Sequence, residues 1–449
     1  MAKTQDLTSG STNKLLLFFA FPTLLSNLFQ QFYNLADTAI AGHILGDSAL
    51  VAIGATSSIY SLVLTFATGL NGGFGIIISQ SFGAKDNEKL KNAVAHAIII
   101  NIVLSVIISV FSFVLIGPVL KMMNTPTIQI KAAQSYIIVI LSTIAIPLLY
   151  NLESTVLRAI GDSKTPLYFL ILASLLNIAL DYIFIKYLHM DVMGAAAATV
   201  AAQALACILC FFVILKNFKI TALNKGNFKI NKNLFRNMMS AGMAMAAMNS
   251  IFSIGSIIMQ SAINALGETI IAAHLASRKL VEMFMQPLVT IGLSCSTFVG
   301  QNYGAKKYER ILSAIKYSLI YTLLWSVLSF FILFFAGGKM AELITGSANP
   351  EITANTQLYL KINAPFYFVL AVLFILRFSI QSIDRKIPPL ISSSMELLSK
   401  LGAAFIFIPL WGYTGACIAE PLSWCLGSIY LVFEFKKAIK IIKTAQHQM

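Results

Sequence analysis

One acidic residue, Asp37, interrupts the first long apolar segment of the chain. It lies near the end of that segment, in the stretch QQFYNLADTAIAG, residues Gln30–Gly42. A carboxylate at bilayer depth costs roughly 2.5–3.5 kcal/mol on insertion scales, so such a group normally faces a cavity or a partner. The position therefore favours a functional role for Asp37, and a carboxylate in such surroundings is suited to binding a cation or a proton.

Further polar residues occur at a similar depth in the first half of the chain. Asp181 lies roughly 25 Å along a segment that starts on the cytoplasmic side, at 1.5 Å per helical residue. Asn177 precedes it by four residues and so shares its helical face. Thr199 lies one to two turns below the outer end of the next segment. These oxygens form a set that alkali and alkaline-earth cations accept.

Two carboxylates brought close in a low dielectric are expected to share a proton or to admit a cation between them. Either event couples a site to an ion gradient. The alternative is a buried hydrogen-bond network that only ties helices together. The presence of two acids, Asp37 and Asp181, favours the ion site over that alternative.

The elements that must position these residues are membrane-spanning helices. The 449 residues are 57% hydrophobic and 11% charged, with a mean hydropathy of +0.79, which excludes an ordinary soluble domain. About 20 helical residues cross a bilayer core, and lipid-exposed backbone must be helical. We therefore expect an all-α integral membrane protein with twelve spans, at 14–38, 48–71, 91–117, 131–153, 164–186, 194–215, 234–262, 270–293, 311–336, 353–378, 387–409 and 414–435.

The net charge of +14 does not indicate a nucleic-acid partner. With the N-terminus in the cytoplasm, most Lys and Arg residues fall on the cytoplasmic side, which is the bias typical of membrane proteins. The densest group lies around the loop between spans six and seven: Lys216, Lys219, Lys225, Lys229, Lys232 and Arg236. We therefore expect a protein of the plasma (cytoplasmic) membrane, with the bilayer around it and both termini in the cytoplasm.

An internal repeat divides the chain. Ser79–Val94 (SQSFGAKDNEKLKNAV) follows span two, and Gly300–Ile315 (GQNYGAKKYERILSAI) follows span eight. Five residues recur 221 positions further on, namely Gln80, Gly83, Ala84, Lys85 and Glu88 as Gln301, Gly304, Ala305, Lys306 and Glu309. The repeat predicts two pseudo-symmetric six-helix bundles, an N-lobe (1–216) and a C-lobe (234–449), joined by a cytoplasmic linker loop (217–233). A substrate cavity is expected between bundles that enter the membrane in the same orientation.

Other residues are weaker candidates. Glu153 is a candidate contact for substrate, with a gate pair to Arg158 or simple hydration as the alternatives. Met259 and Met283 are candidates to line an adaptable cavity, because methionine side chains are flexible; filling gaps in a core is the alternative role. Pro22 predicts a bend in the first helix, since proline removes a backbone donor and clashes with the preceding turn.

Charged residues in the later spans predict local ion pairs. Glu396 and Lys400 are four residues apart on span eleven, and Arg278 and Glu282 have the same spacing on span eight. The five cysteines predict neither a disulfide framework nor a zinc site. These are Cys207, Cys210, Cys295, Cys417 and Cys425.

The ordered motifs resemble the MATE family, the multidrug and toxic compound extrusion transporters, across essentially the whole chain. They are the Asp37 stretch, the paired GAK loops, LRAIGDSKTP (Leu157–Pro166), LLNIALDYIFI (Leu175–Ile185) and AEPLSW (Ala419–Trp424). The resemblance implies secondary active antiport, in which organic, cationic or amphiphilic small molecules are exported by alternating access in exchange for inward H⁺ or Na⁺. No cofactor and no enzymatic activity are expected, and the protein is expected to function as a monomer.

The resemblance places the family's N-lobe ion site on Asp37, Asn177, Asp181 and Thr199, with Asn151 close by. The second half reads Ile258 and Gly402 at the positions that correspond to the two acids, and spans seven and ten carry no acid. This departure puts a C-lobe cation site in doubt and resembles the DinF-like branch of the family.

Two other classes of protein are alternatives. A flippase or exporter of lipid-linked or polysaccharide precursors often has fourteen spans and a cationic cavity, whereas this chain has twelve expected spans and acids in the N-lobe. An intramembrane enzyme would need convergent catalytic groups, and no Gly-Asp active-site motif flanks Asp37 or Asp181.

Overall fold

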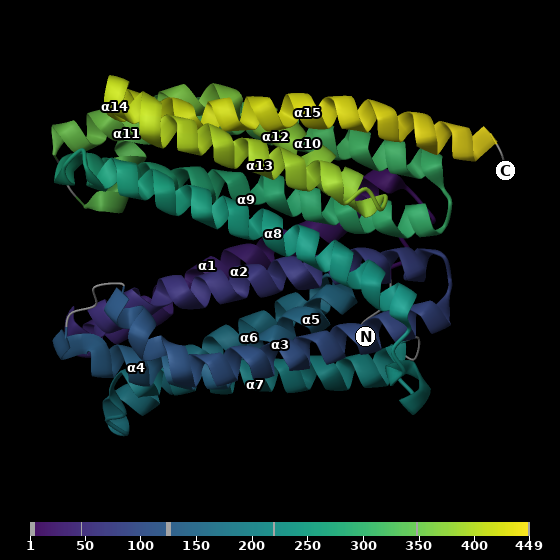
Figure 1. Ribbon diagram of the computed structural model, residues 1–449, viewed down its shortest axis with the longest axis horizontal. Helices are drawn as coiled ribbons and strands as arrows, with labels where there is room; N and C mark the ends of the chain where they lie inside the picture. Colours follow the sequence, from purple (N-terminus) through teal and green to yellow (C-terminus); the bar gives the residue numbers. More distant parts are fainter. Residues whose placement is uncertain (1–4, 46, 123–126, 219–220, 347–348, 448–449) are drawn as a thin grey trace. The chain divides into compact units, whose positions relative to one another are not determined.

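Helices make up all the regular structure in the part of the chain described by the computed structural model (Figure 1). The backbone is described for residues 5–45, 47–122, 127–218, 221–346 and 349–447. Within these ranges, the side chains of 34–39, 41–43, 45, 47–52, 55, 122, 127–129, 345, 441–442 and 444–447 lie outside the description.

The helices follow the repeat of the sequence. The first half carries α1 (Thr12–Leu45), α2 (Asp47–Gly83), α3 (Asn87–Met122), α4 (Thr127–Ser142), α5 (Ala145–Ala159), α6 (Lys164–Asp181), the π-helical η1 (Tyr182–Tyr187), α7 (Asp191–Asn217) and the short 3₁₀ helix η3 (Lys225–Phe228). The second half carries α8 (Lys232–Asn264), α9 (Glu268–Gly304), α10 (Tyr308–Thr345), α11 (Pro350–Asn363), the 3₁₀ turn η4 (Ala364–Phe366), α12 (Tyr367–Ser382), α13 (Ile387–Gly402), the π-helical η5 (Ala403–Phe407), α14 (Ile408–Trp411) and α15 (Tyr413–His447).

Within the described residues, eleven helices are long and apolar enough to cross a membrane. A twelfth span is present if α4 and α5, which meet at a bend of 45°, are taken as one broken span. Pro147 lies in the first turn of α5, and because its ring clashes with the preceding turn, it accounts for the break. Counted in this way, the expectation of twelve spans is confirmed, and the broken span formed by α4 and α5 is the fourth in chain order.

The chain forms two compact units. The first contains Met1–Asp6 and Phe21–Ala246, and the second contains Leu7–Ala20 and Ala247–Met449. The predicted division at 1–216, 217–233 and 234–449 differs from these limits, because the linker and the start of α8 lie in the first unit. The start of α1 lies in the second unit, so α1 and α8 each contribute residues to both.

The two GAK loops have the same backbone geometry. Lys85 and Lys306 both adopt the left-handed conformation, with φ of 58° and 56°. The N–H of the next residue reaches back to the helix in each loop, from Asp86 to the carbonyl of Ser81 at 3.1 Å and from Lys307 to that of Asn302 at 2.8 Å. This is the helix-ending arrangement in which a left-handed residue satisfies the last carbonyls. The sequence repeat is therefore also a repeat of local structure.

Each unit has its own apolar core. In the first, α2, α3, α5 and the start of α8 pack through side chains such as Phe74, Leu90, Leu157 and Met238. In the second, α9, α11 and α12 pack around the buried rings of Tyr359 and Tyr367. Long apolar side chains on α3 and α10 remain exposed, as expected for surfaces in contact with lipid.

Inside the first unit, α2 and α8 approach closely at small residues. A Cβ atom at Gly73 would lie 2.4 Å from the carbonyl oxygen of Ala241 and 2.5 Å from Cα of Gly242. Helices in membranes use such small residues to bring their backbones together. Gly73 is therefore a packing position and not merely a flexible one.

We expect Gly73→Ala to destabilise the protein by about 1–3 kcal/mol, because the added methyl group must push the two backbones apart. Gly54→Ala on the same helix is the matched control, since a Cβ there has nothing within 4 Å. Thermal unfolding in detergent measures both variants. Equal melting temperatures for the two would contradict the close-packing account.

Candidate functional site

Three of the predicted ion-site residues lie together inside the first unit. Asn177 and Asp181 are fully buried at 0% exposure, and Thr199 is 7% exposed. With its amide nitrogen turned toward the carboxylate, Asn177 donates to Asp181 Oδ2 at 3.1 Å and accepts from the backbone N–H of Thr199 at 3.3 Å. In the other amide orientation, Asn177 Nδ2 donates to Thr199 Oγ1 at 3.4 Å. The four-residue spacing on α6, together with the packing of α7 against α6, thus brings an amide, a carboxylate and a hydroxyl to one place.

The local helix geometry changes at the acid. Asp181 is the last residue of α6, and the π-helical segment η1 begins at Tyr182. Single turns of π-helix occur often at functional sites because the wider turn redirects side chains and backbone groups. The corresponding segment of the second half, η5, begins 221 residues later at Ala403 and has Gly402 in place of the acid. The geometry is therefore repeated, but the carboxylate is present in the first half only.

Asp37 lies on α1, but its side chain is outside the described residues. Its approach to Asp181 remains a prediction. Pro22 lies inside α1, which continues through it as one helix, and the carbonyl of Pro22 accepts a hydrogen bond from Ser26 Oγ at 3.0 Å. The limit between the two compact units falls next to this proline, between Ala20 and Phe21.

Asn151 belongs to an amide network with α2 and α3. Its Oδ1 accepts from Asn71 Nδ2 at 3.2 Å, and its Nδ2 donates to Thr68 Oγ1 at 3.3 Å. Asn101 donates to Asn71 Oδ1 at 2.7 Å, and both of these residues are buried. Asn71 and Asn101 lie within the apolar spans two and three, and polar residues at such positions are the sequence signal by which this network could have been found. Asn151 is thus placed by a separate set of partners from Asn177.

The three weaker candidates, Glu153, Met259 and Met283, differ in burial and in surroundings. Glu153 is half-buried. No ion pair between the described residues joins it to Arg158. Met259 is 6% exposed and packs within the core of the second unit, whereas Met283 is 58% exposed. The packing of Met259 fits the gap-filling alternative, and Met283 keeps the exposure that a contact residue needs.

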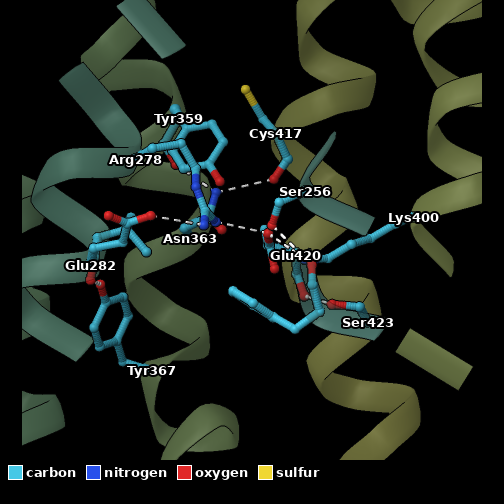
Figure 2. Close-up of polar contacts among 12 residues, drawn as sticks. Ser256, Arg278, Glu282, Tyr359, Asn363, Tyr367, Lys400, Cys417, Glu420 and Ser423 are labelled. Carbon is cyan, nitrogen blue, oxygen red and sulfur yellow. Dashed lines mark hydrogen bonds and ion pairs between the residues drawn. The ribbon is translucent and has the colours of Figure 1, made fainter. Parts of the chain in front are cut away.

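The second unit contains a buried charge cluster that sequence spacing did not predict (Figure 2). Arg278 on α9 and Lys400 on α13 both lie 2.9 Å from the same oxygen, Oε1 of Glu420 on α15. The side chains are 16%, 3% and 9% exposed respectively. Lys400 Nζ also lies 4.6 Å from the centre of the Phe252 ring, at cation–π distance. We call Arg278, Lys400 and Glu420 the charge cluster.

One predicted ion pair is confirmed and another is wrong. Arg278 contacts Glu282 at 3.1 Å, as its spacing suggests. Glu396 and Lys400 do not pair along α13, because each finds a partner on a neighbouring helix. Glu396 binds Arg377 of α12, which also donates to Ser392 at 3.1 Å. A buried charged side chain on a packed helix can pair with a residue of a neighbouring helix. A spacing of four residues along one helix does not show that such a partner exists.

Comparisons with known proteins agree with this architecture. Residues 22–183 and 244–407 match the protein family described as MatE. The chain is 29% identical over 313 residues to the "Probable multidrug resistance protein YpnP" of Bacillus subtilis, covering 69% of each protein. It is 22% identical over 450 residues to an "FAD transporter" of Shewanella oneidensis, covering 99% of this chain and 98% of that protein.

Among solved structures, the fold resembles the crystal structure of a MATE protein "in the bent conformation". The TM-score is 0.92 at 22% identity, and the similarity covers 99% of each chain. The membrane-spanning helices, the repeat and the family match over most of the sequence lead to one conclusion: this chain belongs to the MatE family of multidrug and toxic compound extrusion transporters.

Proposed function

We propose that the protein is a secondary active antiporter of the plasma membrane, with both termini in the cytoplasm. It exports organic, cationic or amphiphilic compounds in exchange for inward H⁺ or Na⁺ by alternating access, and it acts as a monomer without a cofactor. Asp37, Asn177, Asp181 and Thr199 form the ion-coupling site in this proposal.

The buried contact between Asn177, Asp181 and Thr199 is the observation that carries the proposal. A fully buried carboxylate at the end of a membrane helix is expensive unless it is paired, protonated or occupied by a cation. The amide of Asn177 either donates to the carboxylate or turns its oxygen toward the same space. A site of this kind can accept a proton or a small cation without a large rearrangement.

Purified protein in sealed vesicles, driven by an imposed H⁺ or Na⁺ gradient in separate experiments, tests this function. Ethidium is a suitable cationic probe. A pH difference of one unit is equivalent to about 1.4 kcal/mol for each proton, so H⁺ coupling predicts up to about tenfold accumulation per exchanged proton. The Na⁺ gradient alone should drive accumulation if Na⁺ is the ion. Failure of both gradients to move ethidium or any neutral dye would contradict the proposal.

An exporter or flippase of lipid-linked or polysaccharide precursors is the second candidate. The charge cluster favours it, because two buried cations share a single buried carboxylate in the second unit. The relative named as an FAD transporter also shows that a similar chain is associated with an anionic cargo. Movement of a labelled lipid-linked glycan across the vesicle membrane, together with indifference to ethidium, would select this candidate.

A further inference from the structure

The repeated GAK loops have no part in the ion site, yet each makes a dense set of contacts. The loop between α9 and α10 binds the chain segment that precedes α1. Asn302 Nδ2 donates to the carbonyl oxygen of Leu7 at 3.1 Å, and Gln301 Oε1 accepts from the Leu7 N–H at 3.1 Å. Lys307 Nζ donates to the carbonyl of Thr8 at 2.8 Å. Both hydrogen-bonding groups of the Leu7 backbone are therefore held by side chains.

Arg310 completes this set of contacts. Its Nη2 donates to the carbonyl of Leu7 at 2.9 Å, its Nη1 to that of Gly10 at 2.7 Å, and its Nε to Asn302 Oδ1 at 3.1 Å. A guanidinium group holds several acceptors in a fixed planar arrangement, and hydrogen bonds from a charged donor are stronger than neutral ones. We call Gln301, Asn302, Lys307 and Arg310 the first clamp.

Apolar contacts continue the attachment into the helix. Leu7, Leu16 and Phe19 are at most 2% exposed and pack with Phe298 and Ala314 of the second unit. Asn13 accepts a hydrogen bond from the hydroxyl group of Tyr321 on α10. The segment Leu7–Ala20 accordingly belongs to the second compact unit, although α1 continues into the first.

The start of α3, directly after the other GAK loop, holds the segment that precedes α8. Asn227 Nδ2 donates to Asn92 Oδ1 at 2.9 Å and lies 3.5 Å from Glu88 Oε2. The N–H of Asn231 donates to His96 Nε2 at 3.0 Å, and the other ring nitrogen of His96 contacts the carbonyl of Asn92. Glu88, Asn92 and His96 on α3 form what we call the second clamp.

The second clamp also fixes where α8 begins. Asn231 Oδ1 accepts from the N–H groups of Asn233 and Leu234, both at 3.1 Å. It therefore satisfies two of the free donors at the start of the helix. The start of α8, as far as Ala246, belongs to the first unit, and the rest of the helix belongs to the second.

The two clamps are reciprocal. In each repeat, the residues around the loop after the second helix hold the chain just before the first helix of the other repeat. The side chains differ between the halves, as Asn92 corresponds to Ser313 and His96 to Tyr317 at the 221-residue offset. The two clamps nevertheless occupy corresponding places in the two repeats. The segments that they hold lead into α1 and α8, the two helices that contribute to both units. If the loops served only to end a helix, they would not each bind the chain segment that begins the other repeat.

We propose that the two clamps are positioning devices for transport, which keep the start of α1 on the second unit and the start of α8 on the first. The clamps stay closed during the cycle, so that movement of α1 and α8 is confined to the parts beyond the attached segments. Their effect on export rests on the proposed function, whereas the attachment itself does not.

The test opens one clamp at a time and measures hydrogen exchange and transport on the full-length protein. Lys307→Ala combined with Arg310→Ala removes all four hydrogen bonds that charged groups donate in the first clamp, and Arg310→Gln is a milder variant. Amide exchange in residues 7–19 should rise by about tenfold or more, because local opening then costs less free energy. Exchange in residues 221–235 should stay unchanged.

His96→Ala should give the opposite pattern, with faster exchange in 221–235 and unchanged exchange in 7–19. Lys316→Ala is the control that matches the single charge lost in Arg310→Gln, since Lys316 is an exposed residue on α10. In vesicles, the clamp variants should lower the maximal rate of ethidium export several-fold at an unchanged half-saturating concentration. A merely structural role would instead lower the amount of folded protein and leave the rate per folded molecule the same.

Unchanged exchange in residues 7–19 of both first-clamp variants would overturn the clamp. A normal export rate per folded molecule, despite faster exchange, would overturn its role in transport. If the unmodified protein exports nothing under either gradient, the proposed antiport function is refuted, and so is the role of the clamps in transport. The amide hydrogen exchange pattern would still decide whether the two attachments exist.

Discussion

Asp181→Asn is expected to abolish ion-driven export while the protein remains folded. The substitution keeps the shape of the side chain and its contact with Asn177, but it removes the charge that attracts a cation or accepts a proton. One charge moving inward supplies about 2.3 kcal/mol per 100 mV, which is equivalent to about a 50-fold concentration ratio for a neutral substrate. The variant should lose this ion-driven concentration ratio, so that the substrate reaches only equal concentrations on the two sides of the membrane. Accumulation of a neutral dye in vesicles with an imposed potential measures the loss.

Asp162→Asn is the matched control for that experiment. Asp162 is also a buried acid of the first unit, but its oxygens accept from the N–H groups of Lys164 and Thr165, both at 3.0 Å, and from Thr165 Oγ1 at 2.6 Å. It therefore caps the start of α6, a role that asparagine fills nearly as well as aspartate. Export should survive in this variant. Asp37→Asn should behave like Asp181→Asn, and coupled export by both variants would rule out the proposed site.

Glu420→Gln is expected to destabilise the second unit by about 3–5 kcal/mol, the usual effect of removing one partner from a buried ion pair. Arg278 and Lys400 both depend on the same carboxylate oxygen. A neutral amide would leave the buried Lys400 without its carboxylate partner and Arg278 with the half-exposed Glu282 alone. The midpoint of unfolding in a detergent or denaturant titration measures the loss.

Glu282→Gln provides the comparison on the same arginine. Glu282 also contacts Arg278, but its side chain is 50% exposed, so solvent screens the pair and the expected loss is at most about 1 kcal/mol. Adding Lys400→Met to Glu420→Gln should restore part of the stability, because the buried cation that lost its carboxylate partner is then removed. Equal effects of the two single substitutions would show that burial does not set the strength of these pairs.

The sequence alone predicted the features that depend on local spacing. The four-residue spacing of Asn177 and Asp181 places both on one face of α6, and the structure brings them together with Thr199. The matched loops at Lys85 and Lys306 were visible as a repeat, and their backbones are indeed alike. Helix periodicity and bilayer thickness are general constraints, so these predictions needed no knowledge of the tertiary packing.

Predictions that required a choice among partners were less successful. Glu396 and Lys400 have the spacing of a local pair, but each contacts a residue of a neighbouring helix. Asn151 bonds to Asn71 and Thr68, two partners that its place in the sequence did not reveal. Several partners were compatible with each spacing, and the packing of neighbouring helices decided between them.

By itself, the sequence determined the membrane-spanning class, the repeat and the acids at unusual depth, because hydrophobicity, spacing and charge placement are properties of the chain. Only the tertiary structure revealed the charge cluster on Glu420 and the exchange of α1 and α8 between the two units. Both features join residues that are far apart in sequence, such as Leu7 and Arg310. Contacts of this kind depend on how helices pack, and no local pattern encodes them.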